Sequence, residues 1–446
     1  FDQENIVPDI QPNPEDGTVD ITYKLETKSS DQIEFSLGWG ATGLIGTLGL
    51  KFSNFAIQNL FNPESYRIVP QGEGQTFSIN ARTNGVYYTS ASVSFLEPWL
   101  GGKRPNSLST SIFFASQTGY SDRYYQAYQN LYNTYYSYYA YSGNSNYLQQ
   151  LQESEADPNK YLRTFGVSLG YGKRLSWPDD YFSFYGELSY QLYMMKDWPY
   201  MILTDGNSHN LALNFQLSRS SIDNPIYTRR GSQFTIGLKI TPPYSLIRGT
   251  TDAQYAQMST TEKYNLLEYH KWRFSGKVFT PLTADSKLVL MARADFGYLG
   301  HYNKNVKSPF ESFYMGGDGM SSYSSYSTEY ISMRGYQSGS LTPYDPATGR
   351  NMGYVYNKFT MELRYPIALE QNATIWALAF LEAGNCFADI KDYNPFNLKR
   401  SAGVGVRLFL PMFGLMGIDW GWGFDPINGS NQYGGSQFHF VLGQEL

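Results

Sequence analysis

Few residues in this chain could carry out covalent chemistry or hold a metal ion. The 446-residue sequence has one cysteine, Cys386, and four histidines that lie far apart, His209, His270, His301 and His439. A single cysteine excludes a disulfide framework and a cysteine-based zinc site, and the histidines lack the spacing of metal ligands. The sequence contains no Gly-x-Ser-x-Gly motif and no glycine-rich phosphate loop. It therefore predicts neither an enzyme nor a bound cofactor.

The composition separates this chain from helical membrane proteins and from typical cytosolic enzymes. Lys and Arg number 34 and Asp and Glu number 39, so the formal net charge is −5, and charged residues make up only 16% of the chain. Aromatic residues reach 17%, with 40 Tyr. A mildly acidic chain without a concentrated basic face argues against nucleic acid as a partner. No run of about 18 apolar residues occurs, which excludes helical membrane spans. A large soluble all-β protein and an outer-membrane β-barrel remain.

Segments with period-two alternation recur from Gln32 to the end of the chain, separated by gaps rich in Gly, Asn, Pro, Ser and Asp. Most are about ten residues long, which suits tilted strands that cross an apolar band roughly 25 Å tall. An even number of strands is typical of a single-chain bacterial barrel. The sixteen expected strands are 32–39, 43–52, 74–82, 86–96, 106–117, 161–172, 181–195, 208–219, 231–241, 267–279, 286–298, 353–365, 373–384, 400–409, 415–424 and 436–444.

Apolar and charged side chains occupy opposite faces of several segments. In 353–365 one face carries Phe359, Met361, Leu363 and Tyr365, and the other carries Lys358, Thr360, Glu362 and Arg364. A soluble sandwich would bury its apolar face, whereas a membrane barrel turns it towards lipid and keeps charges in a water-filled interior. The pattern therefore favours the barrel. The faces of segment 373–384 stay unassigned, because its apolar residues share a face with Glu382.

Gap lengths are asymmetric between the two ends of the expected barrel. Long gaps, among them 118–160 and 299–352, follow odd-numbered strands and so fall at one end. Gaps at the other end are mostly short, with 53–73 as the exception. Outer-membrane barrels show this asymmetry, with the long loops outside the cell. Gap 118–160 holds eleven Tyr between Tyr120 and Tyr147; it is interpreted as a self-packed cover of the mouth or, alternatively, as a partner surface.

Residues 1–31 differ from the rest of the chain. From Thr18 to Glu26 the sequence alternates, with Val19 and Ile21 on one face and polar residues on the other. This pattern predicts a half-buried strand. We expect it to be the last strand of a small domain whose beginning is missing, followed by a short linker.

The gap 299–352 contains Met333-Arg334-Gly335-Tyr336. A hydrophobic residue followed by Arg-Gly-Phe or Arg-Gly-Tyr, on the sixth surface loop between strands eleven and twelve, resembles the signature of the BamA family of outer-membrane assembly proteins. The wider superfamily includes TamA, two-partner secretion transporters and the Sam and Toc translocators. Further similar stretches are Ser220–Pro225 with Arg230-Gly231, Phe380–Asn385, Arg400–Arg407 and, for members from Bacteroidetes, Phe95–Gly102. Leu446 departs from the family, whose members usually end in an aromatic residue.

The resemblance implies a fold and a set of site residues. It implies the end of a last POTRA domain at 1–31 and an all-β, 16-stranded antiparallel transmembrane barrel at 32–446, with loop six at about 299–352. Because a sequestered guanidinium needs partners, we expect Arg334 to pair with Glu362 and Glu382 on the wall. Gly335 is expected to approach the wall closely, and Tyr336 to pack against it.

The resemblance also implies a lateral gate between the first and last strands. Glycine-rich strands pair weakly, and an opened edge could accept an incoming strand by β-augmentation. The implied function is insertion of nascent β-barrel proteins into the bacterial outer membrane without nucleotide or cofactor. Implied partners are those nascent proteins, BamD-like accessory lipoproteins on the periplasmic side and the lipid bilayer. The implied gate residues are Ile33, Phe35, Leu37, Gly38, Gly40, Phe438, Phe440, Leu442 and Gly443.

Other functions remain as alternatives. A two-partner-secretion or TamA-like translocation channel shares the expected N-terminal strand and loop-six motif. A passive pore could be lined by interior basic residues such as Lys271, Arg273 and Arg293. The histidines do not suggest an enzyme: His270 is interpreted as an interfacial residue, and His439 as a wall residue near the seam. The sequence leaves open the substrates, the accessory subunits, the state of the gate and whether Leu446 is the native end.

Overall fold

The computed structural model describes most of the chain. The residues that it describes are 8–13, 18–23, 32–40, 43–66, 68–85, 87–102, 105–120, 156–198, 201–319, 328–345, 350–370, 373–410 and 414–442. Most of the Tyr-rich gap 118–160 lies outside these ranges, so its two interpretations stay open.

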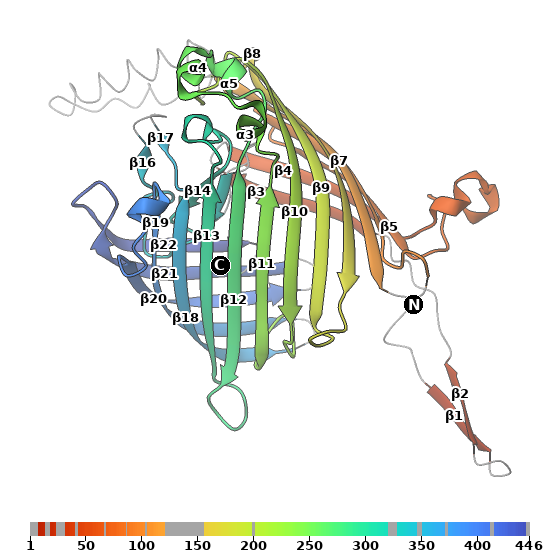
Figure 1. Ribbon diagram of the computed structural model, residues 1–446. Helices are drawn as coiled ribbons and strands as arrows, with labels where there is room; N and C mark the ends of the chain where they lie inside the picture. Colours follow the sequence, from red (N-terminus) through yellow and green to blue (C-terminus); the bar gives the residue numbers. More distant parts are fainter. Residues whose placement is uncertain are drawn as a thin grey trace, which may run out of the picture.

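One large antiparallel sheet of sixteen strands dominates the fold, and each strand pairs with its neighbours in chain order (Figure 1). The expectation of an all-β chain with sixteen antiparallel strands is confirmed. The strands are β3 Gln32–Gly40, β4 Gly43–Phe55, β5 Gln75–Thr83, β6 Tyr88–Glu97, β7 Asn106–Tyr120, β8 Ala156–Arg174, β9 Phe182–Lys196, β10 Gly206–Ser220, β11 Gly231–Ile240, β12 His270–Pro281, β13 Val289–Gly300, β18 Val355–Leu369, β19 Thr374–Phe387, β20 Lys399–Leu410, β21 Gly414–Pro426 and β22 Tyr433–Leu442.

The remaining elements are short. Two antiparallel strands, β1 Pro8–Asn13 and β2 Thr18–Tyr23, pair with each other only. In the part of the chain that the structure describes, the connections contain α3 Tyr244–Arg248, α4 Asp252–Gln257, α5 Thr260–Lys263, several 3₁₀ turns, and the short strands β14 Ser312–Met315, β15 Thr328–Ile331, β16 Tyr344–Asp345 and β17 Arg350–Asn351. Within the described ranges, no helix is both long and apolar enough to cross a bilayer.

The N-terminal hairpin differs from expectation in two respects. The strand β1 was not predicted, because Pro8 and Pro12 weaken any strand assignment; both sit in a pair that has no further neighbour. Val19 and Ile21, expected on a half-buried face, are each 52% exposed. Two paired strands alone offer no second layer to cover either face. The assignment of 1–31 to a POTRA domain stays a prediction.

The two faces of the large sheet carry different side chains. On β18 the outward residues Phe359, Met361, Leu363 and Tyr365 are 40–51% exposed, whereas the inward residues Lys358, Thr360, Glu362 and Arg364 are each 2% exposed. The outward side chains form an exposed apolar surface on this strand. This is the arrangement of a barrel wall that faces lipid.

The interior is not uniformly polar, contrary to the expectation of a water-filled lumen. On β19 the inward side chains Trp376, Leu378 and Phe380 are at most 4% exposed, and Leu381 on the outward face is 59% exposed. The inward residues pack with apolar residues of β12 and β13 and with Tyr227 into one buried cluster. This resolves the faces of segment 373–384: Trp376, Leu378, Phe380 and Glu382 all point inward, because this part of the interior is filled with protein.

The connections fall into two sets at opposite ends of the sheet. We call one the long-loop end, because 241–269 and the described parts of 301–354 begin and end there. The other, the short-turn end, holds brief turns and one longer connection between β4 and β5. In Figure 1 the helices α3–α5 lie at the long-loop end at the top. Loop six is not confined to that end: much of it turns into the interior.

The sheet ends at β3 and β22. The strand β3 pairs with β4 from Gln32↔Lys51 to Gly40↔Gly43, and β22 pairs with β21 from Met416↔Leu442 to Pro426↔Tyr433. Among the described residues, no ladder joins β3 to β22. Each of these strands therefore has one edge without a β partner in the described chain.

Candidate functional site

The motif of loop six forms a tight turn inside the barrel. The Met333 N–H donates to the Gly317 carbonyl at 2.9 Å, and the Gly317 N–H donates to the Tyr336 carbonyl at 3.0 Å. Gly335 has φ of 84°, a left-handed value that glycine adopts without strain. Met333, Arg334 and Tyr336 are each 0% exposed. The turn is thus held by its own backbone and is completely enclosed.

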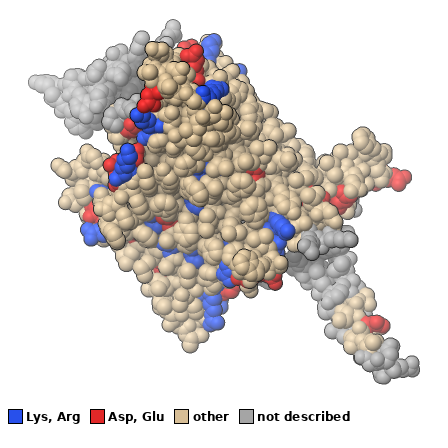
Figure 2. Space-filling model, viewed as in Figure 1, with Lys and Arg blue, Asp and Glu red and all other residues tan. Residues whose placement is uncertain are grey.

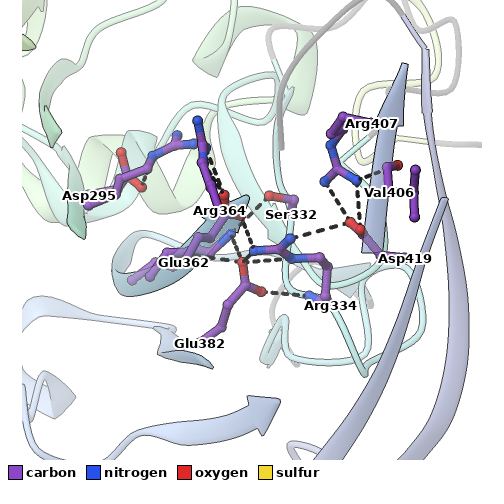
Figure 3. Close-up of polar contacts among 12 residues, drawn as sticks. Asp295, Ser332, Arg334, Glu362, Arg364, Glu382, Val406, Arg407 and Asp419 are labelled. Atoms are coloured by element: carbon purple, nitrogen blue, oxygen red, sulfur yellow. Dashed lines mark hydrogen bonds and ion pairs between the residues drawn. The ribbon is translucent and has the colours of Figure 1, made fainter. Parts of the chain in front are cut away.

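The Arg334 guanidinium contacts three carboxylates from three strands (Figure 3). Its Nη2 lies 2.7 Å from Glu362 Oε1 on β18 and 2.8 Å from Glu382 Oε1 on β19. Its Nη1 lies 3.3 Å from Asp419 Oδ2 on β21. The backbone N–H of Arg334 donates to Glu382 Oε2 at 2.8 Å. The pairing with Glu362 and Glu382 that the resemblance implied is therefore present in the structure, and Asp419 adds a third partner.

Further cations complete the network. Arg364 donates to Glu362 Oε2 through Nε at 2.9 Å and Nη2 at 2.7 Å. Arg407 donates to both oxygens of Asp419, at 2.6 and 2.8 Å. Lys358 lies 3.1 Å from Glu382 Oε1. These side chains are all nearly inaccessible to water, so the carboxylates are satisfied within the protein, as buried charges must be.

The environment favours arginine over other residues at position 334. Burial by itself lowers the pKa of the Arg334 guanidinium, but the carboxylates of Glu382, Glu362 and Asp419 outweigh this and raise the pKa above its ordinary value. The guanidinium carbon lies 3.6 Å from the centre of the Phe380 ring, a cation–π contact. The planar fork serves several acceptors at once, which an ammonium cannot do in the same geometry.

Gly335 lies against the last two strands. A Cβ added there would lie 2.7 Å from the Gly423 amide nitrogen of β21. Side chains at Gly421 or Gly434 would meet the Gly335 backbone in the same way. The close approach expected for Gly335 therefore requires glycine on both sides of the contact. The Gly335 N–H also donates to His439 Nε2 on β22 at 2.8 Å.

Tyr336 ties the turn to two further strands. Its hydroxyl donates to the Arg400 carbonyl on β20 at 2.9 Å and accepts the Asp425 N–H of β21 at 3.3 Å. Burial raises the pKa of Tyr336 to about 12, so the hydroxyl keeps its proton and its donor role. The motif thus contacts all five strands from β18 to β22.

A second anchor fixes loop six to β11 and β12, which follow β18 and β13 in the sheet order. Glu311, 1% exposed, accepts from Lys239 Nζ of β11 at 3.2 Å and from Lys271 Nζ of β12 at 3.1 Å. The Tyr269 hydroxyl donates to Glu311 Oε1 at 2.8 Å. Burial raises the pKa of Glu311, but Lys239 and Lys271 outweigh it and lower the pKa to about 2. Loop six therefore spans the interior between two ionic contacts.

The expected gate residues lie on the two end strands without contacting each other across a ladder. Phe35, Leu37, Gly38 and Gly40 lie within the β3–β4 register, and Leu442 pairs with Met416. The exposed side chains on these strands include Ile33 at 78%, Phe438 at 65% and Phe440 at 55%. Gly443 lies outside the described residues.

Comparisons with known proteins agree with this geometry. A family model for the Omp85 superfamily domain matches residues 71–446. The chain belongs to the Omp85 superfamily. The resemblance inferred from the loop-six motif is confirmed at this level.

Solved structures share the fold of this Omp85 chain. BamA from Haemophilus ducreyi lacking POTRA domains 1–3 matches 98% of this chain and 75% of its own, with 18% identity and a TM-score of 0.59. CdiB from Escherichia coli matches 98% of this chain and 66% of its own, with 11% identity and a TM-score of 0.51. CdiB from Acinetobacter baumannii matches 98% of this chain and 65% of its own, with 13% identity and a TM-score of 0.50. At such identities the likeness shows the barrel fold.

Two residues of the Omp85 site escaped prediction. Asp419 lies on the inward face of β21 between Gly417 and Gly421, whereas Ile418, Trp420 and Trp422 alternate on the outward face. A carboxylate among glycines at inward positions is the signal that could have identified it. His439, interpreted as a wall residue near the seam, does lie on β22, but its side chain is 4% exposed and points inward. Its contact with Gly335 crosses over a hundred residues of sequence and leaves no local signal.

The site offers ionic and hydrogen-bond contacts. Its three carboxylates converge on a guanidinium, which occupies the place that a cation would take. Among the residues that the structure describes, no three His, Cys, Asp or Glu side chains are grouped so as to hold a metal ion. The arrangement can fix a loop to a wall, and that is a mechanical role.

Proposed function

We propose that this chain inserts β-barrel proteins into the outer membrane through an opening between β3 and β22. Membership of the Omp85 superfamily supports a role in inserting or translocating outer-membrane proteins. The observation that carries the more specific proposal is the sheet order, in which β3 and β22 each keep an edge without a ladder in the described chain.

Free strand edges supply the driving force. Within a bilayer, each unsatisfied N–H or C=O group costs several kcal/mol, so an edge there favours any strand that pairs with it. An incoming strand could add to β3 or β22 by β-augmentation. The energy of this pairing replaces nucleotide hydrolysis, and we propose a non-enzymatic mechanism without a cofactor.

Contacts of loop six would confine the opening of the wall to the seam between β22 and β3. Contacts of Arg334, Gly335 and Tyr336 reach β18–β22, so these strands are cross-linked from the inside as well as through their ladders. In the described chain the motif makes no polar contact with β3–β6. The wall from β18 to β22 would therefore move as one body, and the seam beside β22 would separate first.

The same proposal fixes orientation and partners. The long-loop end faces the outside of the cell and the short-turn end, with the N-terminal hairpin, faces the periplasm, as in outer-membrane barrels. Partners are nascent β-barrel proteins, the lipid bilayer and BamD-like accessory lipoproteins on the periplasmic side.

A disulfide across the seam tests the proposal. Cysteine at Ile33 of β3 is combined in turn with cysteine at Phe438, Phe440 or Leu442 of β22, and cross-linking is read by gel shift. The periplasm permits disulfides. We expect the cross-linked chain to abolish growth and deplete outer-membrane porins, with recovery on reduction. Normal growth with complete cross-linking would contradict the proposal.

The matched control is a disulfide within an existing ladder. Ile418 of β21 and Phe440 of β22 are direct partners, so linking them adds a covalent bond where the strands already pair. We expect this variant to grow normally. A growth defect here as well would show that oxidation or the substitutions, and not the seam, cause the effect.

A translocation channel is the second candidate, favoured by the matches to the two CdiB chains. Depletion of the protein followed by a census of outer-membrane porins distinguishes the two. Loss of many porins supports insertion; intact porins together with loss of one secreted protein support the channel.

A further inference from the structure

A lobe formed by residues 56–74 connects β4 to β5 and breaks the rule of brief turns at the short-turn end. It contains two 3₁₀ turns, Ile57–Phe61 and Pro63–Ser65. In Figure 1 it is the orange segment that projects sideways from the wall, and it does not lie across the opening of the barrel. Neither loop six nor the seam uses this lobe, so the function proposed above leaves it unexplained.

The base of the lobe is firmly held. The Ala56 N–H donates to the Pro70 carbonyl and the Gly72 N–H to the Asn54 carbonyl, both at 3.0 Å. The Ile57 N–H donates to Gln75 Oε1 at 2.8 Å. Below these contacts, the Phe55 and Phe77 rings stack at 5.2 Å. The lobe is therefore an ordered projection with a fixed position on the wall.

This ordered projection presents large apolar side chains outward. Phe61 is 97% exposed and Ile68 is 75% exposed. Ile57, Leu60 and Tyr66 are 43–46% exposed. Removing such side chains from water stabilises a protein, and a cluster of exposed apolar side chains marks an interaction surface. We therefore expect an apolar partner to cover the exposed side chains of this lobe.

The lobe continues into the apolar wall. Gln75 at its base donates to Glu97 Oε2 at 2.7 Å, and the other Glu97 oxygen accepts the Trp99 N–H at 2.8 Å. The turn fixed in this way exposes Trp99 by 55% and Leu100 by 40%. Above it, outward residues of the wall such as Val93 are also exposed. Gln75 thus links the lobe to this turn, and exposed apolar side chains occur on the lobe, the turn and the wall alike.

The charge of the lobe indicates which lipid it would meet. In Figure 2 the lobe is tan apart from acidic atoms. Its described acidic residues are Glu64 and Glu73, and the one basic residue of the stretch, Arg67, lies outside the described residues. The described side chains of the lobe therefore carry no positive charge that would attract anionic headgroups, and its exposed apolar side chains supply the contact.

We propose that the lobe is an interfacial anchor that inserts Phe61 and Ile68 into the headgroup boundary of zwitterionic phospholipid at the short-turn end. Amphipathic surface elements bind membranes in this way, through apolar side chains placed a few ångströms below the headgroups. The anchor would hold β4 and β5, and through them β3, at a fixed depth. The inference does not depend on the function proposed above, because it concerns contact with lipid in the resting protein.

Site-specific fluorescence tests the anchor. Cysteine replaces Phe61, Ile68 or, as the matched control on the same lobe, Glu64, and carries an environment-sensitive fluorophore. The purified protein is reconstituted into vesicles of phosphatidylcholine and phosphatidylethanolamine. The unmodified chain gives the labelling background, because Cys386 is buried.

We expect the probe at 61 and at 68 to emit at shorter wavelength and to be several-fold less accessible to iodide than the probe at 64. Quenchers attached to lipid chains should reduce the fluorescence of the probes at 61 and 68 and leave that of the probe at 64 unchanged. Adding anionic lipid should leave the emission wavelengths and the extents of quenching unchanged.

The vesicles hold no other protein, so a protein partner cannot produce this shielding. Equal iodide access at 61 and 64 would overturn the proposal, and so would shielding that appears only after a membrane extract is added. Shielding that disappears when the chain is diluted in lipid would also overturn it, because it would reveal contact between two copies.

Discussion

The position of the Arg334 guanidinium depends on the directions of its hydrogen bonds as well as on its charge. Taking an ion pair out of water costs energy that only complete hydrogen bonding offsets. Here three carboxylates, one aromatic ring and two flanking arginines satisfy that requirement. The arrangement specifies one position of loop six, since any other position would leave the charges unpaired.

Replacing Arg334 by lysine tests this specificity. The ammonium keeps the charge but loses the fork, so at least one buried carboxylate loses one of its two cationic partners, and we expect a loss of about 3 kcal/mol in the free energy of unfolding. We also expect strongly reduced porin levels in cells. Urea unfolding followed by tryptophan fluorescence measures the first and a porin census the second.

Arg400→Lys is the matched control. Arg400 also makes a two-pronged contact, with Asp425, but its side chain is 66% exposed. Water replaces the lost contact there, so stability and porin levels should stay near those of the unmodified chain. Equal effects of the two substitutions would contradict the role given to burial.

Glu311 predicts a pH dependence. Its pKa is lowered from 4.5 to about 2, so its contacts stabilise the folded state above the unfolded value of 4.5 and this contribution is lost as the pH falls towards 2. At neutral pH a shift of that size corresponds to roughly 3 kcal/mol. We expect Glu311→Gln to be less stable than the unmodified chain at pH 7, and the difference to shrink between pH 4.5 and 2. A difference independent of pH would refute the assignment.

At the scale of elements, loop six and β22 are joined by a hydrogen bond from a loop backbone N–H to a strand side chain. The Gly335 N–H has its acceptor on His439, the only residue of β22 whose described polar side chain reaches the motif. Because β22 has a single ladder in the described chain, this contact is an additional restraint on its position. It joins the loop to the strand next to the seam.

Changing His439 to phenylalanine should loosen that restraint. The Gly335 N–H would be buried without an acceptor, which costs about 1–3 kcal/mol. We expect cross-linking between β3 and β22 cysteines to fall as β22 becomes less well placed, and glutamine at 439, which keeps an acceptor, to restore part of it. His209→Phe is a control, since His209 bonds Tyr190 on a wall that the motif does not contact.

Sequence patterns predicted the elements better than the contacts between them. The sixteen strands were predicted within a few residues because a membrane wall imposes strict alternation, as in β18. The alternation pattern did not assign the faces of β19, because protein fills the interior there and the inward face is apolar. Arg334, Glu362 and Glu382 were found through a motif at a known position in the strand order. Asp419 and His439 were missed because their roles depend on strands brought together only by the fold.

The whole molecule is a sheet of sixteen strands with two unequal ends. Interior strands such as β9 have a ladder on each side, whereas β3 and β22 have one each. Local stability follows the number of such contacts. The seam should therefore be the least protected part of the wall.

Hydrogen exchange in proteoliposomes measures this difference. We expect amide protons of β3 and β22 to exchange much faster than those of β9, because half of the end-strand amides point to an edge without a ladder. Uniform protection around the wall would indicate a fully paired seam and would weaken the proposed insertion route.

The aromatic cluster beneath loop six has one more consequence. Tyr227 reaches from a turn at the short-turn end to Trp376, with ring centres 5.8 Å apart, and its hydroxyl donates to the Lys287 carbonyl. A hollow cylinder of this size would leak salts and dyes and undermine the cell's permeability barrier. Apolar rings packed across one side of the interior narrow the aqueous route. Under the insertion mechanism proposed above, the wall would open sideways for a substrate while hydrated solutes still meet an obstacle along the barrel axis.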